Sequence, residues 1–240
     1  MIQLSKGSER GHANHGWLES WHSFSFADYY DPDKMGVASL RVINDDRINA
    51  KGGFPTHPHR DMEIITYVLS GELTHQDSMG NGSVIRAGDV QKMSAGTGIR
   101  HSEFNPSQDT PTHLLQIWIQ PKRLGIAPGY AQKHYSAADK KGRLCLIASP
   151  NPDSAALLLQ QDVNLYAAIL AVKDIITHAL PANRIAYLHV ASGTVMANRM
   201  ALTAGDAIRL EDETLLTLST PNRAEVLLFD INPDINQEPI

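Results

Sequence analysis

The sequence predicts an all-β protein built from two related antiparallel β-barrel domains of the jelly-roll type. Short segments rich in Val, Ile, Leu, Thr and Tyr recur along the chain, and Gly, Asn, Asp and Pro separate them, which is typical of antiparallel β-structure. Similar strand-and-turn motifs occur in both halves of the chain. Few stretches have the apolar periodicity of a helix, so helices are expected to contribute little.

Several segments predict individual elements of this fold. Ala38–Ile43, Glu63–Leu69 and Leu114–Ile119 have the composition of strands. Met79–Gly82 contains an Asn-Gly pair, the strongest short signal for a β-hairpin, and so predicts a tight turn between two strands. Ser154–Gln161 is the best candidate for a helix, although these residues could equally begin a strand.

A repeated motif indicates that the two halves are duplicated. Tyr67–Leu73, followed by Ala87–Val90, resembles His189–Val195, followed by Ala204–Ala207. In both halves a strand leads into a Ser-Gly turn and a second strand, and an Ala-Gly-Asp turn precedes the next strand. Because a repeated sequence unit predicts a repeated architecture, we expect one barrel in each half.

The Gly, Pro, Lys and Ala content of Pro121–Lys141 is typical of an interdomain linker. We therefore predict two domains, over residues 1–125 and 126–240. The histidines are shared unequally between them, since eight of the eleven precede Pro121 and only His134, His178 and His189 follow it. The chemistry is accordingly expected in the first domain.

Composition and charge exclude several classes of protein. Hydrophobic residues make up 42% and charged residues 20% of the chain, as in a folded globular protein and unlike a disordered one. The formal net charge of -5 gives no basic surface for phosphate backbones, so direct nucleic-acid binding is not expected. No stretch resembles a signal peptide or a membrane span. We expect a cytoplasmic protein, taken to be a monomer.

Two pairs of potential metal ligands occur with the spacing of a strand. His57 and His59 are two residues apart, and so are His101 and Glu103. Side chains at positions i and i+2 of a strand point to the same face, roughly 7 Å apart. If both pairs faced one barrel interior, they would supply three imidazole nitrogens and one carboxylate oxygen to a single ion.

In an arbitrary protein, a His-x-His pair is more often a pair of surface or hydrogen-bonded histidines. Here the second pair, the barrel context and the surrounding stretches favour a metal site. Those stretches are His15–Leu18, Trp21–Phe26, Asp31–Pro32, Thr56–His59, His75–Gly80 and Met93–Glu103. They resemble the metal-binding motifs of the cupin superfamily and, more closely, those of the pirin family within it. The resemblance covers most of residues 10–120 and is weak in the C-terminal half, where it implies a second cupin barrel without metal.

The resemblance to pirins implies that the metal ligands are His57, His59, His101 and Glu103, and all four are present. In most cupins the carboxylate ligand is the Glu that follows His-x-His, which is Glu63 here. In pirins it is the Glu beside the last His. We therefore prefer Glu103 and keep Glu63 as the alternative.

A mixed shell of imidazole and carboxylate suits Fe, Zn, Cu, Ni, Mn or Co, and the sequence does not separate these metals. The resemblance points to Fe(II). Four protein ligands on a six-coordinate ion leave two positions for water, O2 or substrate, as in catalytic metal sites. Between Ile185 and Asp230 there is no His-x-His and no His-x-Glu, so we expect no metal site in the second barrel.

Other polar and aromatic residues are interpreted as structural. His75 and Asp77 lie just before the turn at Gly80, so we interpret them as a solvated strand end. Three N-terminal histidines are interpreted as hydrogen-bonded residues, one of which could contact a metal ligand: His12, His15 and His22. Six aromatic residues are expected to pack a strand against the barrel, with one or two lining a pocket: Trp17, Trp21, Phe24, Phe26, Tyr29 and Tyr30.

The resemblance implies an oxidoreductase similar to quercetinase, a metal-dependent dioxygenase that opens the heterocycle of a flavonol such as quercetin with O2 and releases CO. The metal would hold the substrate as its enolate or phenolate and couple it to O2. Glu103 is expected to be the catalytic residue, a ligand that loosens and accepts the proton of the substrate hydroxyl. The expected partners are a flat, flavonoid-like substrate and O2.

Two alternatives accompany this hypothesis. In the first, the chain is a non-enzymatic regulatory protein, in which a redox change at the metal alters a surface that binds a protein partner. In the second, the ion only fastens the barrel. A cavity discriminates between them, because a dioxygenase needs one that opens onto the metal and admits a flat aromatic molecule, whereas a sensor could have a closed site.

Overall fold

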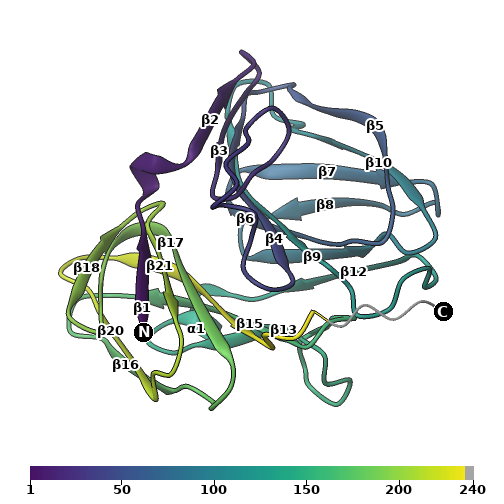
Figure 1. Ribbon diagram of the computed structural model, residues 1–240. Helices are drawn as coiled ribbons and strands as arrows, with labels where there is room; N and C mark the ends of the chain where they lie inside the picture. The colour runs from purple at the N-terminus through teal and green to yellow at the C-terminus, as the bar shows by residue number, and fades with distance from the viewer. Residues whose placement is uncertain (236–240) are drawn as a thin grey trace. The chain divides into compact units, whose positions relative to one another are not determined.

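The computed structural model describes residues 1–235, which form two compact units. The N-terminal unit comprises Gly11–His134, and the C-terminal unit comprises Met1–Arg10 together with Tyr135–Ile235. Both units consist mainly of antiparallel strands (Figure 1), which confirms the predicted all-β fold with two antiparallel domains. No helix within the described residues is long and apolar enough to span a membrane.

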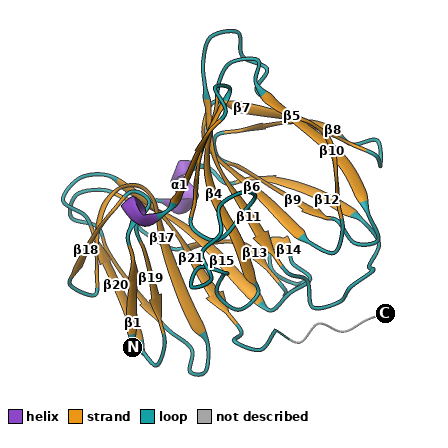
Figure 2. Cartoon of the chain, turned by 45° about the horizontal axis from the view of Figure 1, so that its top comes forward, coloured by secondary structure: helices purple, strands orange, loops and turns teal. Residues whose placement is uncertain are grey.

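The N-terminal unit contains two sheets. Its strands are β2 (Gly11–Asn14), β3 (Leu18–His22), β4 (Leu40–Ile48), β5 (Gly53–His59), β6 (Glu63–Ser70), β7 (Glu72–Asp77), β8 (Gly82–Arg86), β9 (Asp89–Ser94), β10 (Ile99–Phe104), β11 (Thr112–Ile119) and β12 (Gly129–His134). The larger sheet has the order β12-β9-β6-β11-β4-β3-β2, and the smaller has the order β5-β10-β7-β8. Figure 2 shows the two sheets as separate layers.

The C-terminal unit repeats the all-β architecture. Its elements are β1 (Ile2–Ser5), the 3-10 turn η1 (Gly7–Glu9), α1 (Ala137–Lys140), β13 (Cys145–Ser149), β14 (Leu157–Leu158), β15 (Val163–Leu170), β16 (Ile175–Ala179), β17 (Ile185–Ala197), β18 (Met200–Thr203), β19 (Ala207–Leu210), β20 (Leu215–Ser219) and β21 (Ala224–Ile231). The main sheet has the order β1-β19-β17-β21-β15-β13-β14. In addition, β16 pairs with β20, and both β18 and β20 pair with β17.

The predicted strands form the centre of the larger N-terminal sheet. β11 lies between β4 and β6, with Ile117 opposite both Ile43 and Ile65. All three side chains are fully buried, and burial of each contributes about 1.5–3 kcal/mol. The predicted hairpin joins β7 to β8. Ser154–Gln161 contains no helix; it contains β14, which pairs in parallel with β13, as the strand alternative allowed.

The duplicated motif has the same backbone geometry in both units. Gly71 and Gly193 have φ values of 76° and 78°, and Gly88 and Gly205 have φ values of 92° and 87°. Residues with a Cβ atom are strained in this left-handed region, whereas Gly adopts it freely. The repeat seen in the sequence therefore reflects turns of the same shape at corresponding points of the two units.

Strand pairing divides the chain differently from the predicted domains 1–125 and 126–240. β12 lies inside the predicted linker Pro121–Lys141 but pairs with β9 along its whole length, so it belongs to the N-terminal unit. α1 follows at once, with a capping box formed by Ser136 and Asp139. β1 pairs with β19, which places the first residues in the C-terminal unit. About half of the predicted linker is therefore regular structure, because long-range pairing overrides its loop-like composition.

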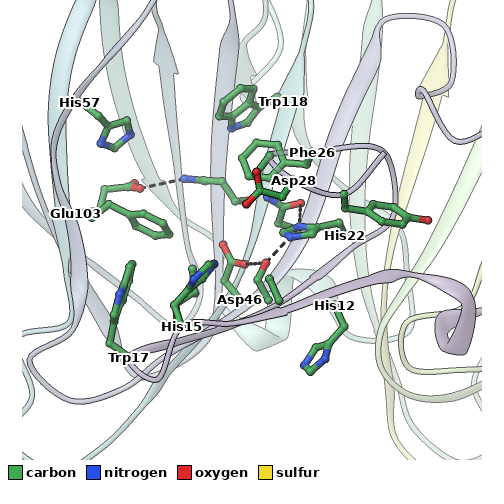
Figure 3. A pocket seen from close by; sticks show the side chains of 18 of the residues that line it. His12, His15, Trp17, His22, Phe26, Asp28, Asp46, His57, Glu103 and Trp118 are labelled. Atoms are coloured by element: carbon green, nitrogen blue, oxygen red, sulfur yellow. Dashed lines mark hydrogen bonds between the residues drawn. The ribbon is translucent and has the colours of Figure 1, made fainter. Parts of the chain in front are cut away.

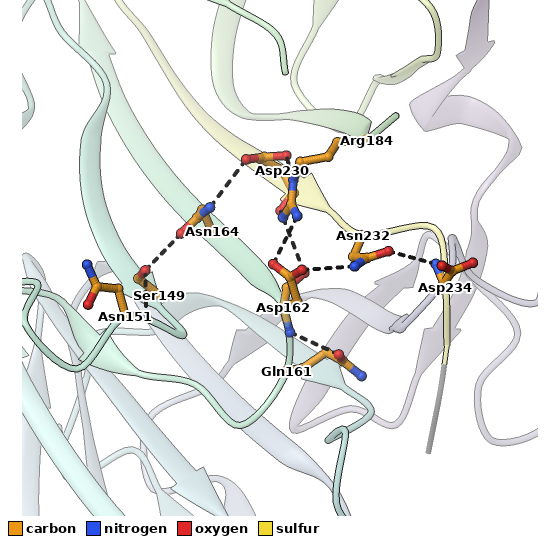
Figure 4. Close-up of polar contacts among 9 residues, drawn as sticks. All are labelled: Ser149, Asn151, Gln161, Asp162, Asn164, Arg184, Asp230, Asn232 and Asp234. Carbon is orange, nitrogen blue, oxygen red and sulfur yellow. Dashed lines mark hydrogen bonds and ion pairs between the residues drawn. The ribbon is translucent and has the colours of Figure 1, made fainter. Parts of the chain in front are cut away.

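An ion-pair network in the C-terminal unit surrounds the buried carboxylate of Asp230 (Figure 4). Arg184 Nη1 lies 2.9 Å from Asp162 Oδ1, and Arg184 Nε donates to the carboxylate of Asp230. Asn164 Nδ2 donates to the same carboxylate at 3.3 Å. Asp230 is only 5% exposed. A buried charge without a partner destabilises the folded state. The guanidinium of Arg184 is therefore expected to offset most of the cost of burying the Asp230 carboxylate.

We expect Arg184→Met to lower the free energy of unfolding by about 3–5 kcal/mol, because the Asp230 carboxylate would stay buried without its cation. Arg209→Met is the matched control. Arg209 pairs with Glu211 where both side chains are about one-third exposed, and such surface pairs contribute at most about 1 kcal/mol. Urea unfolding followed by circular dichroism measures both losses, and equal losses would contradict the expectation.

Candidate metal centre

Antiparallel pairing of β5 with β10 brings the two predicted ligand pairs together. His57 lies directly opposite His101, and His59 lies opposite Ile99. The burial of β10 alternates, so that His101 and Glu103 both point into the barrel. A β-bulge between these two residues places one extra residue in β5. Such bulges bend a strand and re-aim its side chains, and they are frequent beside active sites.

Three imidazole rings converge on one point. The ring centroids of His57 and His101 are 4.5 Å apart, those of His57 and His59 are 4.7 Å apart, and those of His59 and His101 are 4.8 Å apart. One nitrogen of each ring lies within 4.8 Å of the others. Among the described residues, no group offers a hydrogen bond to the buried Nε2 of His101. Because an orphaned buried nitrogen is costly, a cation is a partner that fits this position.

The protonation states of these rings suit a metal. His57 Nδ1 lies 2.8 Å from the carbonyl oxygen of Pro55, which can only accept, so Nδ1 carries the hydrogen and Nε2 keeps its lone pair. Burial lowers the pKa of His59 to about 4, and repulsion from His57 adds to this effect. Burial likewise lowers the pKa of His101 to about 2. Both rings are therefore neutral near pH 7, the state that binds metals.

Glu103 is 2% exposed and hydrogen-bonded. Its Oε2 accepts from Gln116 Nε2 at 3.0 Å, and its Oε1 from Thr66 Oγ1 at 3.4 Å. Burial raises the pKa of Glu103 to about 7, with repulsion from Asp46 adding to the shift. The carboxylate is grouped with His101 and His75 rather than with the first three histidines. His101 therefore belongs to both groups of potential ligands.

Glu63, the alternative ligand, has different neighbours. Its Oε1 accepts a hydrogen bond from Ser94 Oγ at 2.5 Å and lies 3.8 Å from Lys92 Nζ. Within the described residues, Glu63 belongs neither to the group of His57, His59 and His101 nor to the group of His75, His101 and Glu103. Since a buried lysine already compensates its charge, Glu63 is placed less well than Glu103 to hold an ion.

The interpretation of His75 and Asp77 as a solvated strand end is wrong. Both side chains are fully buried, because β7 is an inner strand of the smaller sheet and pairs with β10, with His75 opposite Glu103. The alternation from Leu73 through His75 to Asp77 is the signal that could have shown an inward-facing strand. Proximity to the turn at Gly80 outweighed that signal in the prediction.

A cavity of about 640 Å³ lies beside the candidate centre (Figure 3). Its volume falls within the range of ligand-binding sites, roughly 300–1,000 Å³. His57, His59 and Glu103 line one part of it. Much of the remaining wall is aromatic and comes from the N-terminal segment, β5 and β11: Trp17, Phe26, Tyr29, Phe54 and Trp118. The prediction that one or two of the N-terminal aromatic residues could line a pocket thus underestimated their number.

Another part of the cavity wall is polar. Ser20 Oγ donates to Asp46 Oδ1 at 2.5 Å, and His22 Nδ1 lies 2.8 Å from Asn44 Oδ1. Burial raises the pKa of Asp46 to about 7. The three N-terminal histidines all line this cavity: His12, His15 and His22. His22 is hydrogen-bonded as predicted, and its contact with the cavity is a feature that sequence reasoning did not anticipate.

Comparisons with known proteins agree with this architecture. The pirin family model matches residues 4–119, and a model described as the quercetinase C-terminal cupin domain matches residues 146–231. A quercetin 2,3-dioxygenase of Escherichia coli strain K12 is 49% identical over 97% of this chain and 100% of its own length. The chain belongs to the pirin family. A pirin-like protein of Caulobacter vibrioides is 45% identical over 96% of this chain and 99% of its own.

Solved pirin structures have the same fold. The crystal structure of YhhW from Escherichia coli has a TM-score of 0.93 at 49% identity, covering 98% of this chain and 99% of its own. Bacterial pirin YhhW in complex with nickel(II) has a TM-score of 0.92 at 48% identity, covering 98% of this chain and 100% of its own. The predicted family, the bicupin fold and the resemblance to quercetin 2,3-dioxygenases are thereby confirmed.

We expect Glu103→Gln to weaken Zn(II) binding, because it removes the negative charge beside the imidazoles. Loss of a residue that only contacts a metal ligand typically weakens binding roughly 10- to 100-fold. The loss on replacing Glu103, a proposed ligand, should be larger. Glu63→Gln is the matched control, since it makes the same change at the other buried glutamate and should alter the affinity little. Competition with a chromophoric chelator measures both dissociation constants. A larger loss in the Glu63 variant would make Glu63 the ligand.

Proposed function

We propose that this pirin is a metal-dependent dioxygenase that opens the heterocycle of a flavonol such as quercetin with O2 and releases CO. The ion would be Fe(II), and its ligands would be His57, His59, His101 and Glu103. The observation that carries the proposal is that the cavity and the candidate metal centre share His57, His59 and Glu103. A molecule in the cavity would therefore lie against the ion.

The cavity wall suits a flat, oxygen-rich molecule. Trp17 and Phe54 pack edge to face at 5.0 Å, and Phe26 and Trp118 do so at 5.3 Å, so rigid aromatic surfaces bound the space. Trp118 contributes its ring to this wall, whereas its Nε1 is buried and has no hydrogen-bond partner within the described residues. Asp46 and the polar side chains beside it offer further partners for phenolic hydroxyl groups.

The chain's own residues would prepare the substrate for O2. When bound, the metal supplies Lewis-acid polarisation of a substrate oxygen and couples the substrate to O2. Glu103 would loosen from the ion and accept the proton of the substrate hydroxyl as a general base. Gln116 and Thr66 hold this carboxylate in place. One flavonol and one O2 give one ring-opened product and one CO, so no external reductant is required.

The cavity favours an enzyme over the regulatory alternative, in which a redox change at a closed metal site would alter a partner-binding surface. A sensor does not need a cavity of this size lined by its own potential ligands. An ion that only fastens the barrel does not need one either. Turnover of a flavonol distinguishes the enzyme from both alternatives.

We expect quercetin, added without O2 to the Fe(II)-loaded protein, to show a shifted absorption band, since its deprotonated oxygen would bind the metal. Admitting O2 should then release one CO per flavonol consumed. Glu103→Gln at saturating Fe(II) should still bind quercetin but turn over at least about 100-fold more slowly, the usual contribution of a general base. Metal-free protein is the control for the band shift.

Two outcomes would count against the proposal. Full turnover by metal-loaded Glu103→Gln would remove the proton-accepting role of Glu103 while leaving the dioxygenase assignment intact. If the wild-type protein showed no substrate-dependent spectral change and no CO, the regulatory function would be favoured instead.

A further inference from the structure

We propose that His75 and Asp77 form a positioning pair that sets His101 in the tautomer that binds the metal. The inference rests on the proposed ligand role of His101 and extends the site to two residues outside the ligand set. His75 is 0% exposed, His101 is 2% exposed, and the side chain of Asp77 is 0% exposed. Water therefore does not compete for the contacts between them.

The chemistry of each contact fixes the positions of the hydrogens. Asp77 Oδ2 lies 3.3 Å from His75 Nε2, and because a carboxylate only accepts, Nε2 carries the hydrogen. A neutral imidazole has a single N–H, so His75 Nδ1 is an acceptor. It lies 3.5 Å from His101 Nδ1, and these two nitrogens can bond only if His101 Nδ1 donates. His101 Nε2 is then left with a free lone pair.

Asp77 is held firmly in its accepting position. Its Oδ1 accepts from the backbone N–H groups of Met79 and Asn81 at 2.9 and 3.0 Å, and its Oδ2 accepts from Asn81 Nδ2 at 2.8 Å. Several donors on one carboxylate favour its charged form. The turn between β7 and β8 therefore serves to present a fixed acceptor to His75.

Neighbouring aromatic rings also restrict the His75 ring. The ring of Tyr130 lies 5.0 Å from it, and the Tyr130 hydroxyl donates to Gln132 Oε1 at 2.8 Å while it contacts Ser83 Oγ. The ring of His101 also packs near the His75 ring, with the two ring centroids 5.3 Å apart. Packing against these rings restricts the rotation of the His75 ring that would exchange the positions of its two nitrogens.

His75 could itself be considered a ligand, because it is grouped with His101 and Glu103. Both of its nitrogens, however, are committed in this arrangement, one to Asp77 and the other to His101. Metal-binding histidines usually donate their second N–H to such a partner, which fixes the tautomer and raises the basicity of the ligand. His57 makes the corresponding contact with the Pro55 carbonyl.

The first test requires no substitution. 15N NMR of the metal-free protein at neutral pH reports which nitrogen of each histidine carries hydrogen. We expect His101 to be protonated at Nδ1 alone and His75 at Nε2 alone. A His101 ring protonated at Nε2 would overturn the proposal, and so would a doubly protonated His75.

The second test measures the Zn(II) dissociation constant of two variants at the same position. His75→Leu removes the acceptor and should weaken binding roughly 10- to 100-fold. His75→Asn places an amide oxygen near the position of Nδ1, so it should recover most of the affinity. A role in packing alone predicts that Asn, which is smaller and polar, impairs binding at least as much as Leu, and this order would overturn the proposal.

Two controls separate the positioning role from the metal site itself. His113→Leu makes the same change at a histidine that belongs to neither group of potential ligands nor to the cavity wall, and it should bind Zn(II) as the wild type does. His101→Ala should abolish binding at the site. If it does so while His75→Leu binds normally, the positioning role fails and the proposed site stands. If His101→Ala binds normally, the proposed site fails. If His75→Leu does not fold, the tautomers of His75 and His101 measured by NMR in the wild-type protein test the proposal instead.

Discussion

The register between β5 and β10 is the constraint on which the candidate site depends. It sets His57 opposite His101, and the alternation of side chains along β10 keeps Glu103 on the same inner face as His101. A slip of one residue would turn every side chain of β5 to the other face and remove both His57 and His59 from the barrel interior. β7 pairs with the other edge of β10, which adds His75 to the same layer.

Desolvation of this interior acts on acids and bases in opposite directions. It lowers the pKa of His59 and His101 and raises the pKa of Glu103, since burial disfavours any charged form. A cation reconciles these effects, because it binds neutral imidazoles and favours an ionised carboxylate. The C-terminal unit compensates its buried carboxylate at Asp230 differently, with the guanidinium of Arg184.

The features that the sequence predicts correctly are local ones. Short runs of apolar and β-branched residues define strands such as Glu63–Leu69, and glycines with left-handed φ values mark the duplicated turns at Gly71 and Gly193. The spacing of two residues within each potential ligand pair is local as well. The preference for Glu103 over Glu63 came from the family resemblance, since spacing alone left both open.

The features that the sequence did not reveal depend on long-range pairing. Composition gives no sign that residues 2–5 pair with β19, or that residues 129–134 pair with β9. The burial of His75 and Asp77 depends on the position of β7 inside its sheet, and the alternation from Leu73 to Asp77 is the only local sign of it. The cavity likewise needs residues from β3, β4, β5, β10 and β11 to meet, and only the assembled barrel brings them together.

The proposed coordination can be examined most directly in a crystal structure of the Zn(II)-loaded protein, with anomalous scattering measured at the zinc absorption edge. One ion is expected beside the cavity, with an oxygen of Glu103 and Nε2 of three histidines at about 2.0–2.2 Å: His57, His59 and His101. An ion bound by His75 or Glu63, or one that does not face the cavity, would contradict this arrangement.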